Sequence, residues 1–199
     1  MAKASWVKTD KTSGSGDATV NVSATTHTGR KARTSVLTWK AANVDDVARS
    51  VSQAGKPEYV DIDDAASSAS GGQIVTISGV SNSARLTFSL GTGGLGITLP
   101  GSYTANSVTT ANGAAITGDP GAASEYNFSI KVTVPANTGT TAVSRQIIVT
   151  DEAGHTDVCT LTLAAGAPYI TIEMSAIELD YLGTAVAVAV KSNTSWTVE

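Results

Sequence analysis

The residues that could do acid–base, nucleophilic or metal chemistry are few. The chain has two histidines, His27 and His155, each in a predicted turn, and a single cysteine, Cys159. Neither histidine stands at metal-ligand spacing to the cysteine or to the other histidine, so we expect no zinc site. No combination of serine, histidine and acid, and no nucleophile elbow, stands out from the Ser- and Thr-rich background. We therefore expect no enzymatic activity and no cofactor.

The remaining polar motifs have simpler interpretations. Asp61-Ile-Asp63-Asp64 could offer oxygen ligands to calcium, but no glycine-punctuated loop follows at ion-binding spacing, so a solvated strand edge is preferred. Gly91-Thr-Gly-Gly-Leu-Gly96 lies between predicted strands and has no helix to receive a phosphate. Cys159 alternates with threonines and shares a strand face with Leu161, which predicts a buried, unreactive thiol.

Three tryptophans are the best candidates for stacking against a sugar ring. Aromatic side chains in small sandwiches are usually core residues, and we prefer that interpretation for Trp6 and Trp196. Trp39 stands beside Lys40 at the end of a predicted strand, where a core role and a ligand-binding role are both open.

The composition indicates an all-β protein. Of the 199 residues, 41% are hydrophobic, 15% charged and 5% aromatic, and β-branched residues and glycines are abundant. A net charge of −4 makes nucleic acid an unsuitable partner. No apolar run is long enough for a membrane span, so we expect no membrane partner. The N-terminal residues lack the apolar region of a signal peptide, so either a leader is missing or the protein acts where it is made.

An internal repeat divides the chain. Ala54-Gly-Lys-Pro-Glu-Tyr-Val-Asp-Ile62 returns as Ala165-Gly-Ala-Pro-Tyr-Ile-Thr-Ile172, and Val20-Asn-Val resembles Ile130-Lys-Val. The stretch 73–82 likewise resembles 186–193. The spacing stays near 110 residues (20 to 130), about the size of one immunoglobulin-like sandwich. We predict immunoglobulin-like β-sandwiches, with a complete central domain at 57–167 and two complementary half-domains at 1–56 and 168–199.

The central domain should contain a full set of strands. Alternating and β-branched stretches predict strands at 59–63, 73–80, 85–90, 96–99, 127–134, 145–150 and 157–163. The Gly- and Ala-rich stretch 100–124 is predicted to be a long loop, with room for a short strand at 115–117.

The two end segments cannot be stable alone. Extended pieces are predicted at 168–173, 177–182, 185–190 and 192–199, and so few antiparallel strands cannot bury both faces and are marginal alone in water. The three-residue linkers 55–57 and 166–168 leave opposite poles of the central domain and are too short for the ends to meet. We therefore predict that the strands 186–198 of one chain complete the N-terminal part of the next, head to tail. There are two alternatives: the two ends form a circularly permuted domain inside one chain, or the chain is truncated from a longer array. The predicted assembly residues are Ile170, Ile172, Val186, Val188, Val190, Trp196, Val198, Trp6, Val20 and Val22.

Several motifs resemble one family when the C-terminal segment is followed by the N-terminal one. Ser192-Asn-Thr-Ser-Trp-Thr-Val leads into Ser5-Trp-Val-Lys, then into the turn Ser13-Gly-Ser-Gly-Asp, a Thr-Gly turn, Arg33 and Val51-Ser-Gln-Ala-Gly55. This order resembles the BACON family of bacterial immunoglobulin-like modules, for which carbohydrate binding was originally proposed. The central unit departs from the pattern, because Arg85 stands where Trp196 would fall.

Two functions follow as expectations. The first is a non-enzymatic structural protein of a virion, such as a capsid decoration or fibre, which forms homo-oligomers and contacts capsid or other virion proteins. The resemblance supports it, because modules of this type are common in phages of gut bacteria. The alternative is a glycan-binding module of a secreted or cell-surface bacterial protein, located outside the cell or on its surface.

Overall fold

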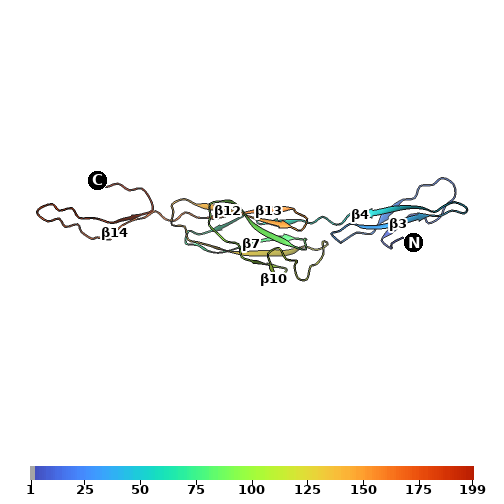
Figure 1. Ribbon diagram of the computed structural model, residues 1–199, viewed down its shortest axis with the longest axis horizontal. Coiled ribbons are helices and arrows are strands. Elements are labelled where there is room, and N and C mark those ends of the chain that lie inside the picture. The colour runs from blue at the N-terminus through green and yellow to red at the C-terminus, as the bar shows by residue number, and fades with distance from the viewer. Residues whose placement is uncertain (1–2) are drawn as a thin grey trace.

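The computed structural model describes residues 3–199, which form β-strands, turns and loops and contain no helix. Figure 1 shows an elongated molecule, in which a thick central body carries a slender part at each end. The N-terminal part with β3 and β4 lies at one end, and the C-terminal part with β14 lies at the other. The strands are β1 (Val7–Thr9), β2 (Val22–Ala24), β3 (Arg33–Trp39), β4 (Val47–Gln53), β5 (Val60–Ile62), β6 (Ala65–Ser68), β7 (Gln73–Ser81), β8 (Leu86–Gly93), β9 (Ser102–Ala105), β10 (Val108–Ala111), β11 (Tyr126–Val134), β12 (Val143–Asp151), β13 (Thr156–Leu163), β14 (Ile170–Ile172) and β15 (Val190–Ser192).

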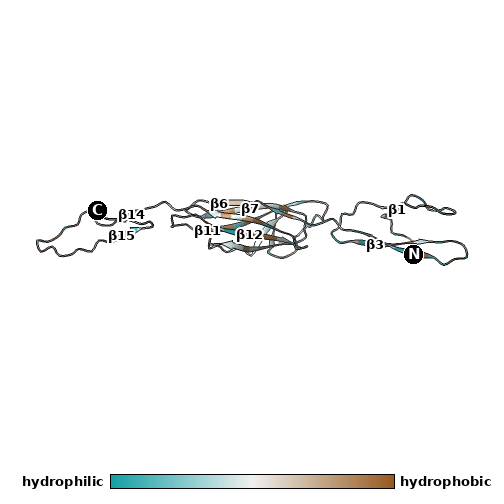
Figure 2. Ribbon diagram, turned by 90° about the horizontal axis from the view of Figure 1, so that it is seen from above, coloured by the Kyte–Doolittle hydropathy of each residue, from teal (hydrophilic) through white to brown (hydrophobic). Residues whose placement is uncertain are grey.

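The central body consists of two sheets that share one core. The five-stranded sheet has the order β10-β9-β11-β7-β5, and the four-stranded sheet has the order β6-β13-β12-β8. All neighbouring strands are antiparallel except β13 and β6, which run parallel. The core draws on both sheets, as in a β-sandwich, and hydrophobic residues gather on the central strands in Figure 2.

Alternation of residue type explains which face of β11, the middle strand of its sheet, packs on the core. Phe128, Ile130, Val132 and Val134 are buried, whereas the intervening side chains of Asn127, Lys131 and Thr133 are exposed. This two-residue period puts one face on the core and the other in solvent. β7 pairs with β11 along its whole length, with Ile77 opposite Ile130.

The core cluster lies entirely between Ile62 and Leu163. Phe88 connects the two sheets, with its ring centroid 5.0 Å from that of Tyr103 and 5.8 Å from that of Phe128. The predicted burial of Cys159 is confirmed, and burial raises the pKa of its thiol to about 11. A thiol with so high a pKa stays protonated at neutral pH and is a poor nucleophile.

Several predicted elements of the central body were wrong. No strand forms at 96–99, whereas β6 forms where no strand is predicted, and β9 and β10 form within the predicted loop. Much of the stretch 100–124 is therefore a hairpin, in which Val108 pairs with Ala105 across a turn at Asn106 and Ser107. Both turn residues have positive φ, 48° and 65°, as a tight two-residue hairpin turn requires.

The end parts contain three separate two-stranded sheets, β1-β2, β3-β4 and β14-β15. The strands predicted at 177–182 and 192–199 do not form as predicted. The strand predicted at 185–190 begins only at Val190. Backbone donors and acceptors in an extended segment need partners on a neighbouring strand. Apart from Val190–Ser192, these segments have no such neighbour among residues 3–199, and most of their residues are exposed.

Candidate functional site

The end parts repeat pairings of the central body, residue for residue. In β3-β4, Arg33 lies opposite Gln53, as Val143 lies opposite Leu163 in β12-β13, with both positions offset by 110. In β14-β15, Ile170 lies opposite Ser192, as Val60 lies opposite Ser81 in β5-β7, with offsets of 110 and 111. The positions of each end part can therefore be matched to those of the central body.

Every strand of the end parts has an open edge, and two of these edges, on β2 and β15, correspond to edges that are covered in the central body. In the central body, β11 pairs with β9 on one side and β7 on the other, and β7 also pairs with β5. The matched strand β2 pairs only with β1, and β15 pairs only with β14, among residues 3–199. The missing neighbour of β2 therefore matches β7, and the missing neighbour of β15 matches β11.

The predicted assembly residues on these strands are far more accessible than their counterparts. Val22 is 44% exposed and Val186 39%, whereas the matched Val132 and Val75 are 0% and 8% exposed. Val20, Val188 and Val190 are half-buried, and Ile170, Ile172 and Val198 are exposed. The structure places the N-terminal and C-terminal members of this set at opposite ends of one chain (Figure 1) and does not bring them together.

A groove of about 640 Å³ opens in the N-terminal part, a feature that the sequence did not reveal. Val20, Leu37 and Trp39 line it together with polar residues such as Thr9 and Lys40. The three apolar residues match Ile130, Ile147 and Val149, all of which belong to the central core. The groove is thus lined by residues whose counterparts are buried in the central core.

The three tryptophans have different surroundings. The ring of Trp6 is half-buried and lies under the Arg33 guanidinium, whose carbon is 4.5 Å from the ring centroid. That contact is a cation–π interaction. Trp39 is 42% exposed at the groove, and Trp196 is 49% exposed in the C-terminal part.

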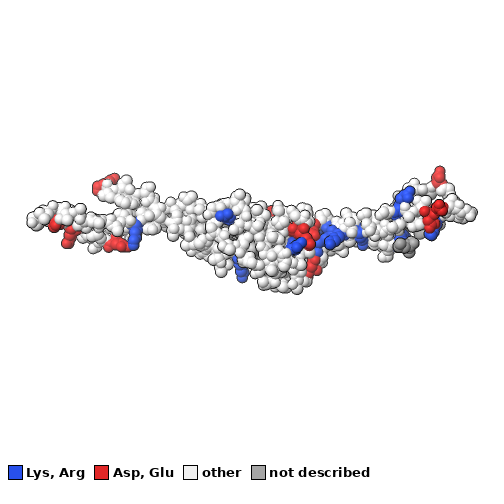
Figure 3. Space-filling model, in the orientation of Figure 1, with Lys and Arg blue, Asp and Glu red and all other residues white. Residues whose placement is uncertain are grey.

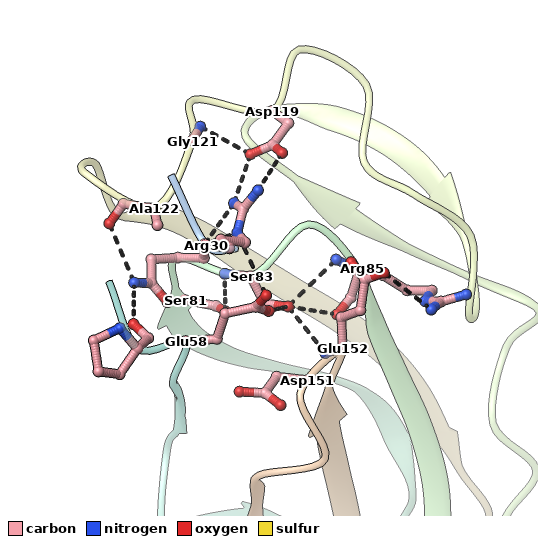
Figure 4. A network of polar contacts seen from close by, with 12 residues as sticks. Arg30, Glu58, Ser81, Ser83, Arg85, Asp119, Gly121, Ala122, Asp151 and Glu152 are labelled. Atoms are coloured by element: carbon pink, nitrogen blue, oxygen red, sulfur yellow. Dashed lines mark hydrogen bonds and ion pairs between the residues drawn. The ribbon is translucent and has the colours of Figure 1, made fainter. Parts of the chain in front are cut away.

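A polar network joins the N-terminal part to the central body, as Figure 4 shows. Arg30 donates hydrogen bonds to the Asp119 carboxylate at 2.5 and 2.7 Å and to the Asn82 carbonyl at 2.5 and 2.9 Å. Its Nε also lies 3.8 Å from the Glu58 carboxylate. The hydrogen bonds from Arg30 lower the pKa of Asp119. No residue pattern pointed to this ion pair.

Buried polar side chains extend the same network into the central body. Ser83 donates to the Glu58 carboxylate and accepts a hydrogen bond from the backbone of Glu152 at 3.0 Å. The Tyr126 hydroxyl donates to the Ser83 carbonyl at 2.8 Å. Among residues 3–199, no buried side-chain nitrogen or oxygen lacks a partner, so the network is complete. It joins Arg30 of the N-terminal part to Glu58, Asn82 and Asp119 of the central body.

Both inter-unit joints use the same asparagine contacts. Asn82 accepts from the Tyr59 backbone at 2.8 Å and donates to the Pro57 carbonyl at 3.0 Å. The matched Asn193 accepts from Tyr169 at 2.9 Å and donates to the Ala167 carbonyl at 3.0 Å. A second shared bond closes each linker, from Lys56 to the Gly29 carbonyl (2.9 Å) and from Gly166 to the Gly139 carbonyl (2.8 Å).

The other candidates for chemistry are held in turns. His27 contacts the Lys31 carbonyl at 2.7 Å, and His155 contacts Asp151 at 2.8 Å. Within residues 3–199, no cluster of His, Cys, Asp and Glu could hold a metal ion. In the same range, no helix is long and apolar enough to cross a membrane. Figure 3 shows basic and acidic side chains interspersed on a mostly uncharged face.

Comparisons with known proteins add little. No model of a known protein family matches the chain, and no curated protein matches it. Among solved structures, the chain is similar to an endo-fucoidan hydrolase of glycoside hydrolase family 107, with 11% identity and a TM-score of 0.29. The match covers 82% of this chain but only 22% of that one. A likeness at this level carries no argument about fold or function.

Proposed function

We propose that the protein is a non-enzymatic structural protein that assembles head to tail by strand complementation. The observation that carries the proposal is a pair of open strand edges, on β2 and on β15. β2 corresponds to β11 and β15 to β7, so each strand corresponds to the neighbour that the other lacks. Strands 186–198 of one copy supply the half-core that the groove of the next copy lacks. Exposed apolar strand edges of this kind are templates for pairing with another chain.

The three units are proposed to be immunoglobulin-like sandwiches of the BACON type, with a complete unit at 57–167 and half-units at 1–56 and 168–199. The motif order from Ser192 to Val198 and from Ser5 to Gly55 supports this assignment. We propose a virion as the location, where the protein acts as a capsid decoration or fibre and contacts other virion proteins.

Light scattering combined with negative-stain microscopy tests the assembly. We expect the mass of the purified chain to increase with concentration, and the images to show rings or fibres of repeating units. Heterologous contacts close or propagate in this way. A monomer that keeps its mass at all concentrations would contradict the proposal.

A second function is favoured by one observation, the exposed Trp39 ring in the groove, because tryptophan faces stack against sugars. On this reading the protein is a glycan-binding module of a bacterial surface or secreted protein. A glycan array decides between the two: binding that is lost in Trp39→Ala and kept in Trp196→Ala supports the glycan function. Assembly without glycan binding supports the first proposal.

A further inference from the structure

We infer a specific register for the joint between copies, in which Val22, Val20 and Ala18 of one chain lie opposite Val186, Val188 and Val190 of the next. This inference rests on the proposed head-to-tail function and deepens it. The central body supplies the template, because β11 and β7 pair as Val132 with Val75, Ile130 with Ile77 and Phe128 with Gly79. The offsets found in the end parts are 110 along β3 and β4 and 111 along β15. Extended to 17–23 and to 185–189, they convert these pairs into the inferred ones.

The hydrogen-bonding edge of β2 agrees with this register. The backbone of β1 and its flanks bonds to Asn21 and Thr25, at 3.1 and 3.0 Å. In an antiparallel ladder, bonds to one neighbour come from alternate residues. The backbone groups of Val20, Val22 and Ala24 therefore point to the open edge. In the central body, Asn127 likewise bonds toward β9, and the even-numbered residues of β11 face β7.

Side-chain sizes at the facing positions also agree. In the central body the large Phe128 lies opposite Gly79, where an added Cβ would come within 2.4 Å of the Phe128 ring. In the inferred joint the small Ala18 lies opposite the larger Val190. The smaller side chain on one strand, Ala18 in place of Phe128, is thus matched by a larger one on the other, Val190 in place of Gly79. This exchange keeps the interior close-packed.

Charges on the solvent face are complementary in the same register. Asn127 pairs with Val80 in the central body, and the matched residues are Asp17 and Lys191. In an extended strand the two-residue period would put both side chains on the outer face, where opposite charges directly across a strand pair are favourable. Lys191 also pairs with Glu173 of its own chain, which leaves it on that face. A slip by two residues would remove the pairing of Asp17 with Lys191 and leave Ala18 opposite Val188 or Ser192.

Exposed positions on the outer faces of the two strands allow the register to be measured by crosslinking. Ser23 lies on the outer face of β2, and Ala185, Ala187 and Ala189 lie on the outer face of the donated strand, all exposed. The inferred register puts Ser23 directly opposite Ala185, at a pair without mutual hydrogen bonds, where Cα atoms approach to about 4.5 Å. A step of two residues displaces the partner by about 6.6 Å along the strand, so the Cα–Cα distance increases to about 8 Å, beyond the limit of about 7 Å for a disulfide.

The test mixes two chains that each carry one added cysteine, Ser23→Cys with Ala185→Cys, Ala187→Cys or Ala189→Cys, under mild oxidation. We expect a crosslinked dimer from the Ala185→Cys mixture at least about tenfold more abundant than from the Ala189→Cys mixture, because only the first pair meets disulfide geometry. Cys159 is buried and present in every mixture, so it serves as a constant background.

The outcomes separate the inference from the proposed function. Assemblies that form by light scattering but crosslink equally or better through position 187 or 189 overturn the register alone. Chains that remain monomeric and do not crosslink in any mixture overturn both. Selective crosslinking at position 185 establishes the register.

Discussion

Asn82 shows how one residue holds several segments of the chain. Its side chain is fully buried and bonds to Tyr59, to Pro57 and, at 3.2 Å, to the Ala122 carbonyl. It therefore fixes both the start of β5 and the loop that carries Asp119. Buried backbone groups that lose their partners cost about 1–3 kcal/mol each.

Asn82→Ala is expected to lower the free energy of unfolding of the main transition by about 3 kcal/mol, because three backbone groups lose a buried partner. Urea unfolding measures this change. Asn193→Ala is the matched control, since Asn193 makes the equivalent contacts but lies in the C-terminal part, outside the core cluster. Equal destabilisation by both substitutions would show that burial at Asn82 is not the cause.

Tyr126 gives the central body a sensitivity to high pH. Burial raises the pKa of its hydroxyl from 10.0 to about 12, so the fold favours the neutral form. The associated stability is fully present below pH 10 and is lost as the pH rises through about 12, a change on the order of 2–3 kcal/mol.

Tyr126→Phe should be about 1 kcal/mol less stable than the wild type at pH 8, because the Ser83 carbonyl loses its donor. That difference should shrink or reverse by pH 12, since phenylalanine cannot ionise. Urea midpoints across this range measure it, and Cys159 contributes equally to both proteins. Tyr181→Phe is the control, because Tyr181 is 95% exposed and should change neither value.

At the scale of elements, the open strands determine what the end parts can do. The stretch 184–192 has the alternation of a buried strand, yet only Val190–Ser192 is ordered as one in the single chain. Its valines would pack into a core only when a further strand covers them.

Val188→Asp is expected to abolish assembly while leaving the main unfolding transition unchanged. Burying an unpaired carboxylate costs several kcal/mol, and about 3 kcal/mol would weaken association more than a hundredfold. Ala187→Asp is the control, because Ala187 is exposed and belongs to the outer face. Light scattering at matched concentrations compares the two, and equal assembly of both variants would show that Val188 is not buried in the joint.

The sequence predicted elements with a strong local pattern. It missed elements whose local pattern is weak and contacts between distant residues. β11 could be predicted because its alternation is uninterrupted over nine residues. The hairpin of β9 and β10 was missed because its turn is Asn106-Ser107, without the glycine that marks such turns. Alternation at 185–190 fixes which side chains share a face, but strand formation also needs a neighbour. The contact of Arg30 with Asp119 joins residues 89 positions apart, which no local pattern reports.

For the whole molecule, the position of the core matters most. Every residue of the core cluster lies between Ile62 and Leu163, whereas the end parts contain only isolated buried residues such as Val7 and Leu37. The central body thus contains what a sandwich needs for independent stability.

Residues 57–167 expressed alone should therefore unfold in one cooperative transition, followed by circular dichroism in urea. Its midpoint should lie close to that of the full chain, slightly lowered by loss of the partly exposed Arg30 contacts. The control is residues 1–56 alone, which should show no cooperative transition. Limited proteolysis gives a second measurement. A central fragment that a protease digests as rapidly as this control would contradict the domain assignment.

The parallel pairing of β6 with β13 has a mechanical consequence. After the chain enters the central body it forms β5 and then β6, and it leaves the body just after β13. β6 and β13 are hydrogen-bonded from Thr160 opposite Ala65 to Leu163 opposite Ser68. Tension between the two end parts would pull these strands past each other along their length. All the bonds between them would then carry the load together and would have to break at once, whereas peeling would break them one by one. The molecule is therefore built to resist stretching along its long axis.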